Sequence, residues 1–218
     1  MKSVALAILL LASHSIGHLQ AAAHPHVEWE TPVPGRLPYF LRADLSPVWR
    51  QVPTSAILLV PAFALSNQNG AAFTQKNMLG CVTVAHFFYT SCSGLCPQVI
   101  RHLLPLQATY AQNAKVNIVS MTIVPNTDNT QVLQAFARAN GIRAANWHLL
   151  TGKQSAIFRL ARQGYQADTR LLDQSPQSDL LHSEHVFLVD QQLRVRGIYN
   201  GNSTAAIEQL MADVGQLL

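Results

Sequence analysis

Two cysteines with three residues between them, in the segment Cys92-Ser-Gly-Leu-Cys96, carry the strongest chemical signal in the sequence. They follow an apolar run at 82–89 that suits a buried strand, and they precede Pro97, a residue type favoured at the first position of a helix. Unpaired N–H groups at a helix N-terminus stabilise negative charge and lower the pKa of nearby thiols. The segment therefore predicts reactive thiolates that can attack disulfides or bind a metal ion.

The metal chemistry of such a pair follows from sulfur being a soft donor. Two thiolates favour Cu(I), Zn(II) or iron–sulfur clusters over hard cations, and a third donor would complete a trigonal site. A structural zinc site needs four ligands, and the sequence has no second close pair of cysteines or of cysteine and histidine. Copper therefore fits better than zinc. The spacing alone is equally compatible with a plain disulfide, but the strand-then-helix setting favours a functional pair.

The third cysteine, Cys81, stands at the start of the apolar run, and Cys92 lies beyond its end. A strand of that length spans about 25 Å, which is far more than the Cα separation that a disulfide tolerates. We therefore expect that Cys81 does not pair with Cys92.

The N-terminus has the pattern of a secretory signal. Lys2 supplies the positive charge, residues 4–12 form a short apolar region, and residues 21–23 offer an A-x-A cleavage site. The apolar run is too short to span a bilayer. We predict that residues 1–23 are removed and that the protein is exported to the periplasm, whereas an uncleaved signal would associate it with the inner membrane.

Length and charge limit the remaining choices. The chain of 218 residues suits one globular domain, which we place at 56–218 after a proline-rich extended lead-in at 24–55. The formal net charge is only +4, with 12% charged residues and no basic run. This pattern argues against nucleic acid as a partner.

Strand-like and helix-like patterns alternate from residue 82 onward, which predicts an α/β fold. We expect a hairpin turning at 67–70, strands at 82–89, 116–123 and 147–150, helices at 97–111, from 128 and at 155–162, a long loop at 164–181, a hairpin of strands at 186–189 and 193–199, and a closing helix capped by Ser203. Pro105 should kink or split the first helix, and Asp128 should cap the second. Ala108 and Val132 are predicted to face the core.

The segment from Phe87 to Pro97, FFYTSCSGLCP, resembles the signature of the Sco/SenC family, the thioredoxin-like copper chaperones of cytochrome c oxidase assembly. Further segments follow in family order at 37–40, 46–49, 63–70, 120–128, 146–152 and 182–190. The resemblance thus covers residues 37–218. It implies a thioredoxin-like α/β fold with a central mixed β-sheet flanked by helices and an N-terminal hairpin or extension.

The family binds copper through both cysteines of its motif and a histidine just before a late strand. The resemblance therefore implies Cys92, Cys96 and His182 as copper ligands. His185 is the competing histidine, but on a strand it would share a face with Phe187, so we expect it to be packed or exposed. The family more often has Lys and Asn in place of Cys81 and His86, and neither departure alters the ligand pattern.

The resemblance implies a monomeric copper chaperone and assembly factor rather than an enzyme. It would bind one copper ion per chain, as Cu(I) or Cu(II), and deliver it to the binuclear centre of cytochrome c oxidase subunit II or to another cuproprotein. The alternative is a thiol–disulfide reductase that uses Cys92 and Cys96 as a redox-active disulfide to keep the target cysteines reduced. A periplasmic thioredoxin-like protein would then supply electrons, and His182 would be dispensable. A peroxidase would need a Thr and an Arg near Cys92, and the sequence does not show that pattern.

Overall fold

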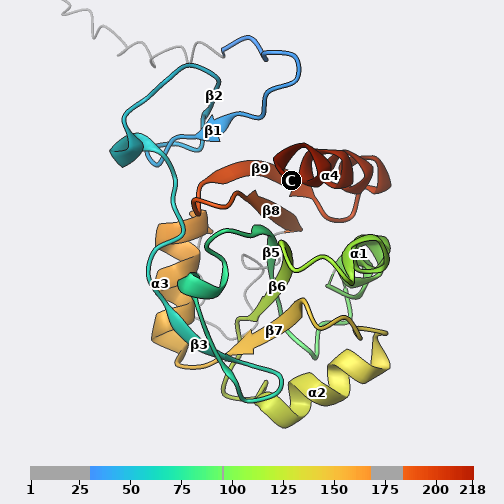
Figure 1. The fold of residues 1–218 in the computed structure, drawn as a ribbon. Helices are drawn as coiled ribbons and strands as arrows, with labels where there is room; N and C mark the ends of the chain where they lie inside the picture. Colours follow the sequence, from blue (N-terminus) through green and yellow to red (C-terminus); the bar gives the residue numbers. More distant parts are fainter. Residues whose placement is uncertain (1–29, 95, 168–183) are drawn as a thin grey trace, which may run out of the picture.

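The computed structural model describes residues 30–94, 96–167 and 184–218 (Figure 1). The predicted signal at 1–23 and the predicted ligand His182 lie outside these residues. The strands are β1 (Tyr39–Phe40), β2 (Pro47–Val48), β3 (Ala64–Asn67), β4 (Ala72–Thr74), β5 (Val82–Phe88), β6 (Val116–Thr122), β7 (Trp147–Thr151), β8 (His185–Val189) and β9 (Val195–Asn200). The helices are α1 (Cys96–Tyr110), α2 (Thr130–Ala139), α3 (Gln154–Tyr165) and α4 (Thr204–Leu217), with short 3-10 turns at Thr54–Ala56 and Gln75–Asn77.

The described strands β3 to β9 form one mixed sheet in the order β4-β3-β7-β6-β5-β8-β9. β5 runs parallel to β6 and antiparallel to β8, and all seven of its residues are buried. Helix α3 covers one face of the sheet, and α1, α2 and α4 cover the other (Figure 1). The predicted α/β fold with a central mixed sheet is confirmed. Burial on both faces explains why β5 and β6 read as nearly continuous apolar runs.

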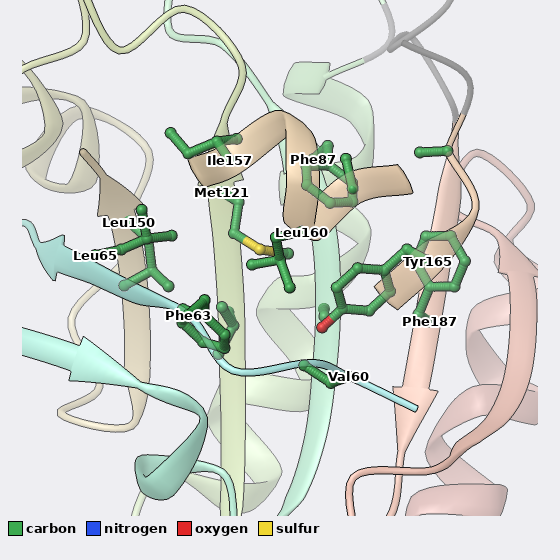
Figure 2. Packing of buried hydrophobic residues seen from close by; sticks show 14 of the residues in the cluster. Val60, Phe63, Leu65, Phe87, Met121, Leu150, Ile157, Leu160, Tyr165 and Phe187 are labelled. Atoms are coloured by element: carbon green, nitrogen blue, oxygen red, sulfur yellow. The ribbon is translucent and has the colours of Figure 1, made fainter. Parts of the chain in front are cut away.

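Two apolar cores lie on the two faces of this sheet. The core beneath α3 is rich in aromatic rings, and Tyr165 packs between Phe87 and Phe187 with ring centroids 5.5 and 4.9 Å away (Figure 2). The core beneath α1 and α4 contains both Cys92 and Cys96. The cysteine pair is therefore part of a packed interior rather than of an isolated surface loop.

Helix α1 continues through Pro105, so the predicted split does not occur. A proline inside a helix leaves the carbonyl four residues earlier without its usual donor. Pro105 and Arg101 are both exposed, so water can reach this carbonyl. Ala108 is also exposed, contrary to prediction, and Leu106 is buried instead.

The N-terminus of α2 differs from the prediction. Asn129, not Asp128, caps the helix, because its side chain accepts a hydrogen bond from the N–H of Val132 at 3.0 Å. Val132 is 36% exposed, and Leu133 and Ala137 are the buried positions. Asp128 is 1% exposed and accepts hydrogen bonds from other parts of the chain.

Helix α3 extends to Tyr165, into the region predicted as a loop. Gly164 permits this, because a Cβ there would lie 2.7 Å from Cδ of Pro61, so the helix can pack closely on the chain before β3. The rest of the predicted loop, from 168 onward, lies outside the described residues. None of the described helices is long and apolar enough to cross a membrane.

The proline-rich lead-in is held against β9 by Arg196. Its guanidinium donates to the carbonyl oxygens of Leu37 and Pro38 at 2.7 and 2.8 Å, and lies 4.2 Å from the ring centroid of Tyr39. The buried carboxylate of Asp190 pairs with the same guanidinium at 3.1 Å. This lead-in therefore packs on the domain although its strands have only two residues each.

His86 is buried in the centre of the sheet. The indole N–H of Trp147 donates to Oγ of Ser120 at 2.9 Å, which leaves the serine proton for Nε2 of His86 at 2.7 Å. Burial lowers the pKa of His86 to about 4. A neutral imidazole therefore fits this network.

We predict that His86 makes folding stability depend on pH. The unfolded state, with an ordinary histidine pKa, binds a proton that the folded state rejects, so stability is lost as the pH falls from 6.5 to about 4. The loss attributable to His86 should reach about 3 kcal/mol. Urea unfolding of the wild type and His86→Asn across this range should show a flatter pH profile for the variant. His185→Asn, which removes an exposed histidine, should run parallel to the wild type, and parallel profiles for all three proteins would contradict the prediction.

Candidate metal and redox centre

The two cysteines lie at the junction of β5 and α1. The backbone N–H of Cys92 donates to the carbonyl of Tyr89 at 3.3 Å, so a tight turn follows the strand. Cys96 is the first residue of α1. Cys92 and Cys96 are 7% and 8% exposed, and both are free thiols. The predicted strand-then-helix setting is therefore confirmed.

The pKa values of the two thiols are shifted in opposite directions. Burial alone would raise the pKa of Cys92, but hydrogen bonds from the Cys96 thiol and from the backbone N–H groups of Cys96 and Gly94 lower it below its ordinary value. Burial raises the pKa of Cys96 to about 12, and its hydrogen bond to Cys92 adds to the rise. Cys92 is therefore the better nucleophile, and Cys96 holds its proton until a partner removes it.

We predict that alkylation distinguishes the two thiols. In a Cys81→Ser background, iodoacetamide at pH 7 should modify Cys92 well before Cys96, because the thiolate is the reactive form. Peptide mass spectrometry over a time course gives the order of modification. Unfolding in urea should remove the difference, and earlier modification of Cys96 in the folded protein would contradict the assignment.

Cys81 lies just before β5, at the opposite end of the strand from the pair. It is a free thiol and donates through Sγ to the carbonyl of Ala114 at 3.5 Å. The prediction that it does not pair with Cys92 agrees with this placement.

The start of β8 lies at the same end of the sheet as the cysteine pair, because His86 of β5 pairs with Val186 of β8. The backbone there is joined to α1 through Gly201, whose N–H donates to the carbonyl of Glu184 at 2.5 Å. The carbonyl of Gly201 accepts from Nδ1 of His102, on α1, at 2.8 Å. These bonds fix the beginning of β8 relative to the helix that carries Cys96.

Two histidines near the start of β8 are candidates for a third ligand. His185 is exposed, as predicted, and its ring centroid lies 6.3 Å from that of Phe187. His182 lies outside the described residues, so its role stays a prediction. Within the described ranges, no three residues of the types His, Cys, Asp and Glu are grouped to hold a metal ion.

We predict that Gly201→Ala disturbs the connection between β8 and α1. A Cβ at this position would lie 2.9 Å from both the Glu184 carbonyl oxygen and Cγ2 of Val99. Overpacking of this kind costs about 1–3 kcal/mol of unfolding free energy. Gly215→Ala is the matched control, since its Cβ would meet only the Tyr110 hydroxyl, at 3.7 Å. Denaturant unfolding should show a loss for the first variant alone, and equal stabilities would refute the steric argument.

The comparisons with known proteins agree with this architecture. A model of the SCO1/SenC family matches residues 52–218. The SCO1 protein homolog of Bacillus subtilis (strain 168) is 29% identical over 157 residues, which cover 71% of this chain and 80% of that protein. The structure of BsSco, described as a member of the Sco family of cytochrome c oxidase assembly proteins with a disulfide switch, is 28% identical with a TM-score of 0.61, covering 73% of this chain and 93% of that one.

ScoI of Bradyrhizobium japonicum, whose structure was solved with copper bound, shares the fold at 21% identity and a TM-score of 0.53, covering 73% of this chain and 99% of that one. These matches confirm the thioredoxin-like fold expected from the resemblance. This chain, which places Cys92 just after β5 and Cys96 at the first position of α1, belongs to the SCO1/SenC family.

Proposed function

We propose that this protein is a copper-binding assembly factor that holds one copper ion through Cys92, Cys96 and His182. The observation that carries the proposal is the buried pair of free thiols at the start of α1 in a member of the SCO1/SenC family. The proposed recipient is the binuclear copper centre of cytochrome c oxidase subunit II. Relatives support this role, because BsSco belongs to a family of oxidase assembly proteins and ScoI of Bradyrhizobium japonicum has been solved with copper.

The residues present fit copper on chemical grounds. Two thiols that lie in one buried cluster and are separated by only three residues can converge on one ion, and soft donors prefer Cu(I). Binding must release the proton that Cys96 holds, so copper affinity should increase with pH. The metal would supply no bond-making step here, since it is the cargo to be transferred.

His182 completes the proposed ligand set. It precedes Glu184 by two residues, and two residues of chain reach at most about 7 Å. Glu184 is joined through Gly201 to the α1 side of the sheet, at the end that also bears the cysteine pair. This reach supports the choice of a histidine before β8.

The proposal also states where the protein acts and which partners it meets there. The signal-like residues 1–23 support export to the periplasm, where a monomer would meet the oxidase subunit. We further propose that the protein is a chaperone rather than an enzyme, and that a periplasmic thioredoxin-like reductant keeps its thiols reduced.

A second function, reduction of the target's disulfide, is favoured by one specific observation. The lowered pKa of Cys92 and the raised pKa of Cys96 are the arrangement of an attacking thiol and a protected partner. The two functions differ in their need for His182, because thiol exchange requires only the cysteines.

We predict that the reduced protein binds one copper ion per chain and that the disulfide form binds it far more weakly, because oxidation removes both thiolates. His182→Ala should weaken Cu(II) binding by roughly tenfold or more and Cu(I) binding less, because Cu(II) is the less soft ion and prefers imidazole as well. Titration followed in the thiolate-to-copper charge-transfer absorption measures both.

The controls for this titration are His185→Ala and Cys81→Ser, which should bind copper like the wild type. Equal losses in His182→Ala and His185→Ala would move the third ligand away from His182. Tight copper binding by the disulfide form would exclude the cysteine pair as the site. A reductase that needs no metal would keep its exchange rate with a target disulfide in His182→Ala.

A further inference from the structure

Asp128 is a buried carboxylate that the proposed copper site does not use. It lies between β6 and α2, and it is 1% exposed. Its oxygens accept hydrogen bonds from the backbone N–H of Thr90 at 3.0 Å, from Oγ1 of Thr90 at 2.5 Å and from Oγ1 of Thr122 at 2.5 Å. Three hydrogen bonds to one buried carboxylate, two of them short, constrain the chain around it.

These contacts join β5 and β6 beyond the end of their ladder. Phe88 and Thr122 are the last paired residues of the two strands, and the N–H of Ile123 donates to the carbonyl of Phe88 at 3.0 Å. Beyond that point Thr90 has left the sheet and would have no partner on β6. Asp128 supplies the next connection in place of the ladder.

Thr90 is the second residue of the turn that presents Cys92. The turn is closed by the hydrogen bond from the Cys92 N–H to the Tyr89 carbonyl. Asp128 binds both the backbone and the hydroxyl donors of Thr90. Asp128, which is not part of the turn, therefore holds it at Thr90, two residues before Cys92.

The carboxylate is itself held in place by its own segment. The N–H of Asp128 donates to the Val124 carbonyl at 3.0 Å, and the next residue, Asn129, caps α2. Leu133 anchors that helix in the core. Asp128 thus connects the cysteine turn by hydrogen bonds to β6 and to the start of α2, both of which are packed in the core.

We propose that Asp128 is a positioning residue for the Cys92–Cys96 pair, and that its hydrogen bonds to Thr90 set the separation of the two sulfurs. Disulfide formation and shared copper binding both require two sulfurs at a fixed separation, so loosening the turn weakens both. The copper part of this inference rests on the proposed function, whereas the disulfide part requires only the two cysteines.

The test uses two variants of Thr90 and one of Asp128. Thr90→Val keeps the shape but removes the hydroxyl donor, and Thr90→Ser keeps both donors. Asp128→Asn replaces one accepting oxygen with a nitrogen that cannot accept. Asp213→Asn is the matched control, because that buried carboxylate accepts from the Tyr199 hydroxyl at 2.6 Å and from Gln209 at 2.8 Å, on β9 and α4 rather than at the turn.

Two measurements are made on the full chain: the disulfide equilibrium with glutathione and the Cu(I) affinity in competition with a chelator. Asp128→Asn and Thr90→Val should each lower the equilibrium constant for disulfide formation about tenfold, which raises the reduction potential by about 30 mV. They should lower copper affinity by a similar factor. Thr90→Ser and Asp213→Asn should match the wild type in both.

The outcomes separate this inference from the proposed function. Unchanged potentials in Asp128→Asn and Thr90→Val would overturn the positioning role, as would an equal shift in Asp213→Asn, which would indicate a general loss of stability. If the wild type binds no copper, the proposed function fails, and the glutathione equilibrium still decides the role of Asp128. Thr90→Val keeps the carboxylate, so it provides the test even if Asp128→Asn does not fold.

Discussion

β5 lies between a parallel neighbour, β6, and an antiparallel neighbour, β8, and is covered by helices on both faces. Complete burial fixes its position, since a shift along either neighbour would break two hydrogen-bond ladders at once and expose apolar side chains. The cysteine turn is the direct continuation of this strand. Its location, and that of the start of β8, therefore depend on the packing of β5.

Two polar groups buried in this interior have a specific set of partners, whereas the buried Thr83 hydroxyl on β5 has no hydrogen-bond partner among the described residues. His86 is matched by Ser120 and Trp147, while Asp128 is matched by Thr90 and Thr122. A buried polar group without a partner costs about 1–3 kcal/mol, so these networks favour one arrangement of the strands over its alternatives. They also connect the stability of the sheet to the geometry at its functional end.

Burial and hydrogen bonding act in opposite directions on the thiol pair. Removal from water disfavours a thiolate, and the N–H groups of Gly94 and Cys96 favour it at Cys92. The proton therefore stays on Cys96, whose thiol donates to Cys92. One pair can in this way present a nucleophile and still bind a soft metal ion once the second proton is displaced.

The sequence by itself determined the order of the main elements, the central strand that begins at residue 82, the cysteine pair at the start of a helix and the family. Apolar runs, proline at a helix start and motif spacing are local signals. Only the tertiary structure decided the roles of Asp128 and Asn129. Either residue can cap a helix, and the choice depends on Thr90, which is 38 residues away along the chain. The tertiary structure also decided the effect of Pro105, because the destabilisation of α1 by a proline depends on which side of the helix faces solvent. Contacts between distant segments are not encoded in local spacing, so these assignments required the folded chain.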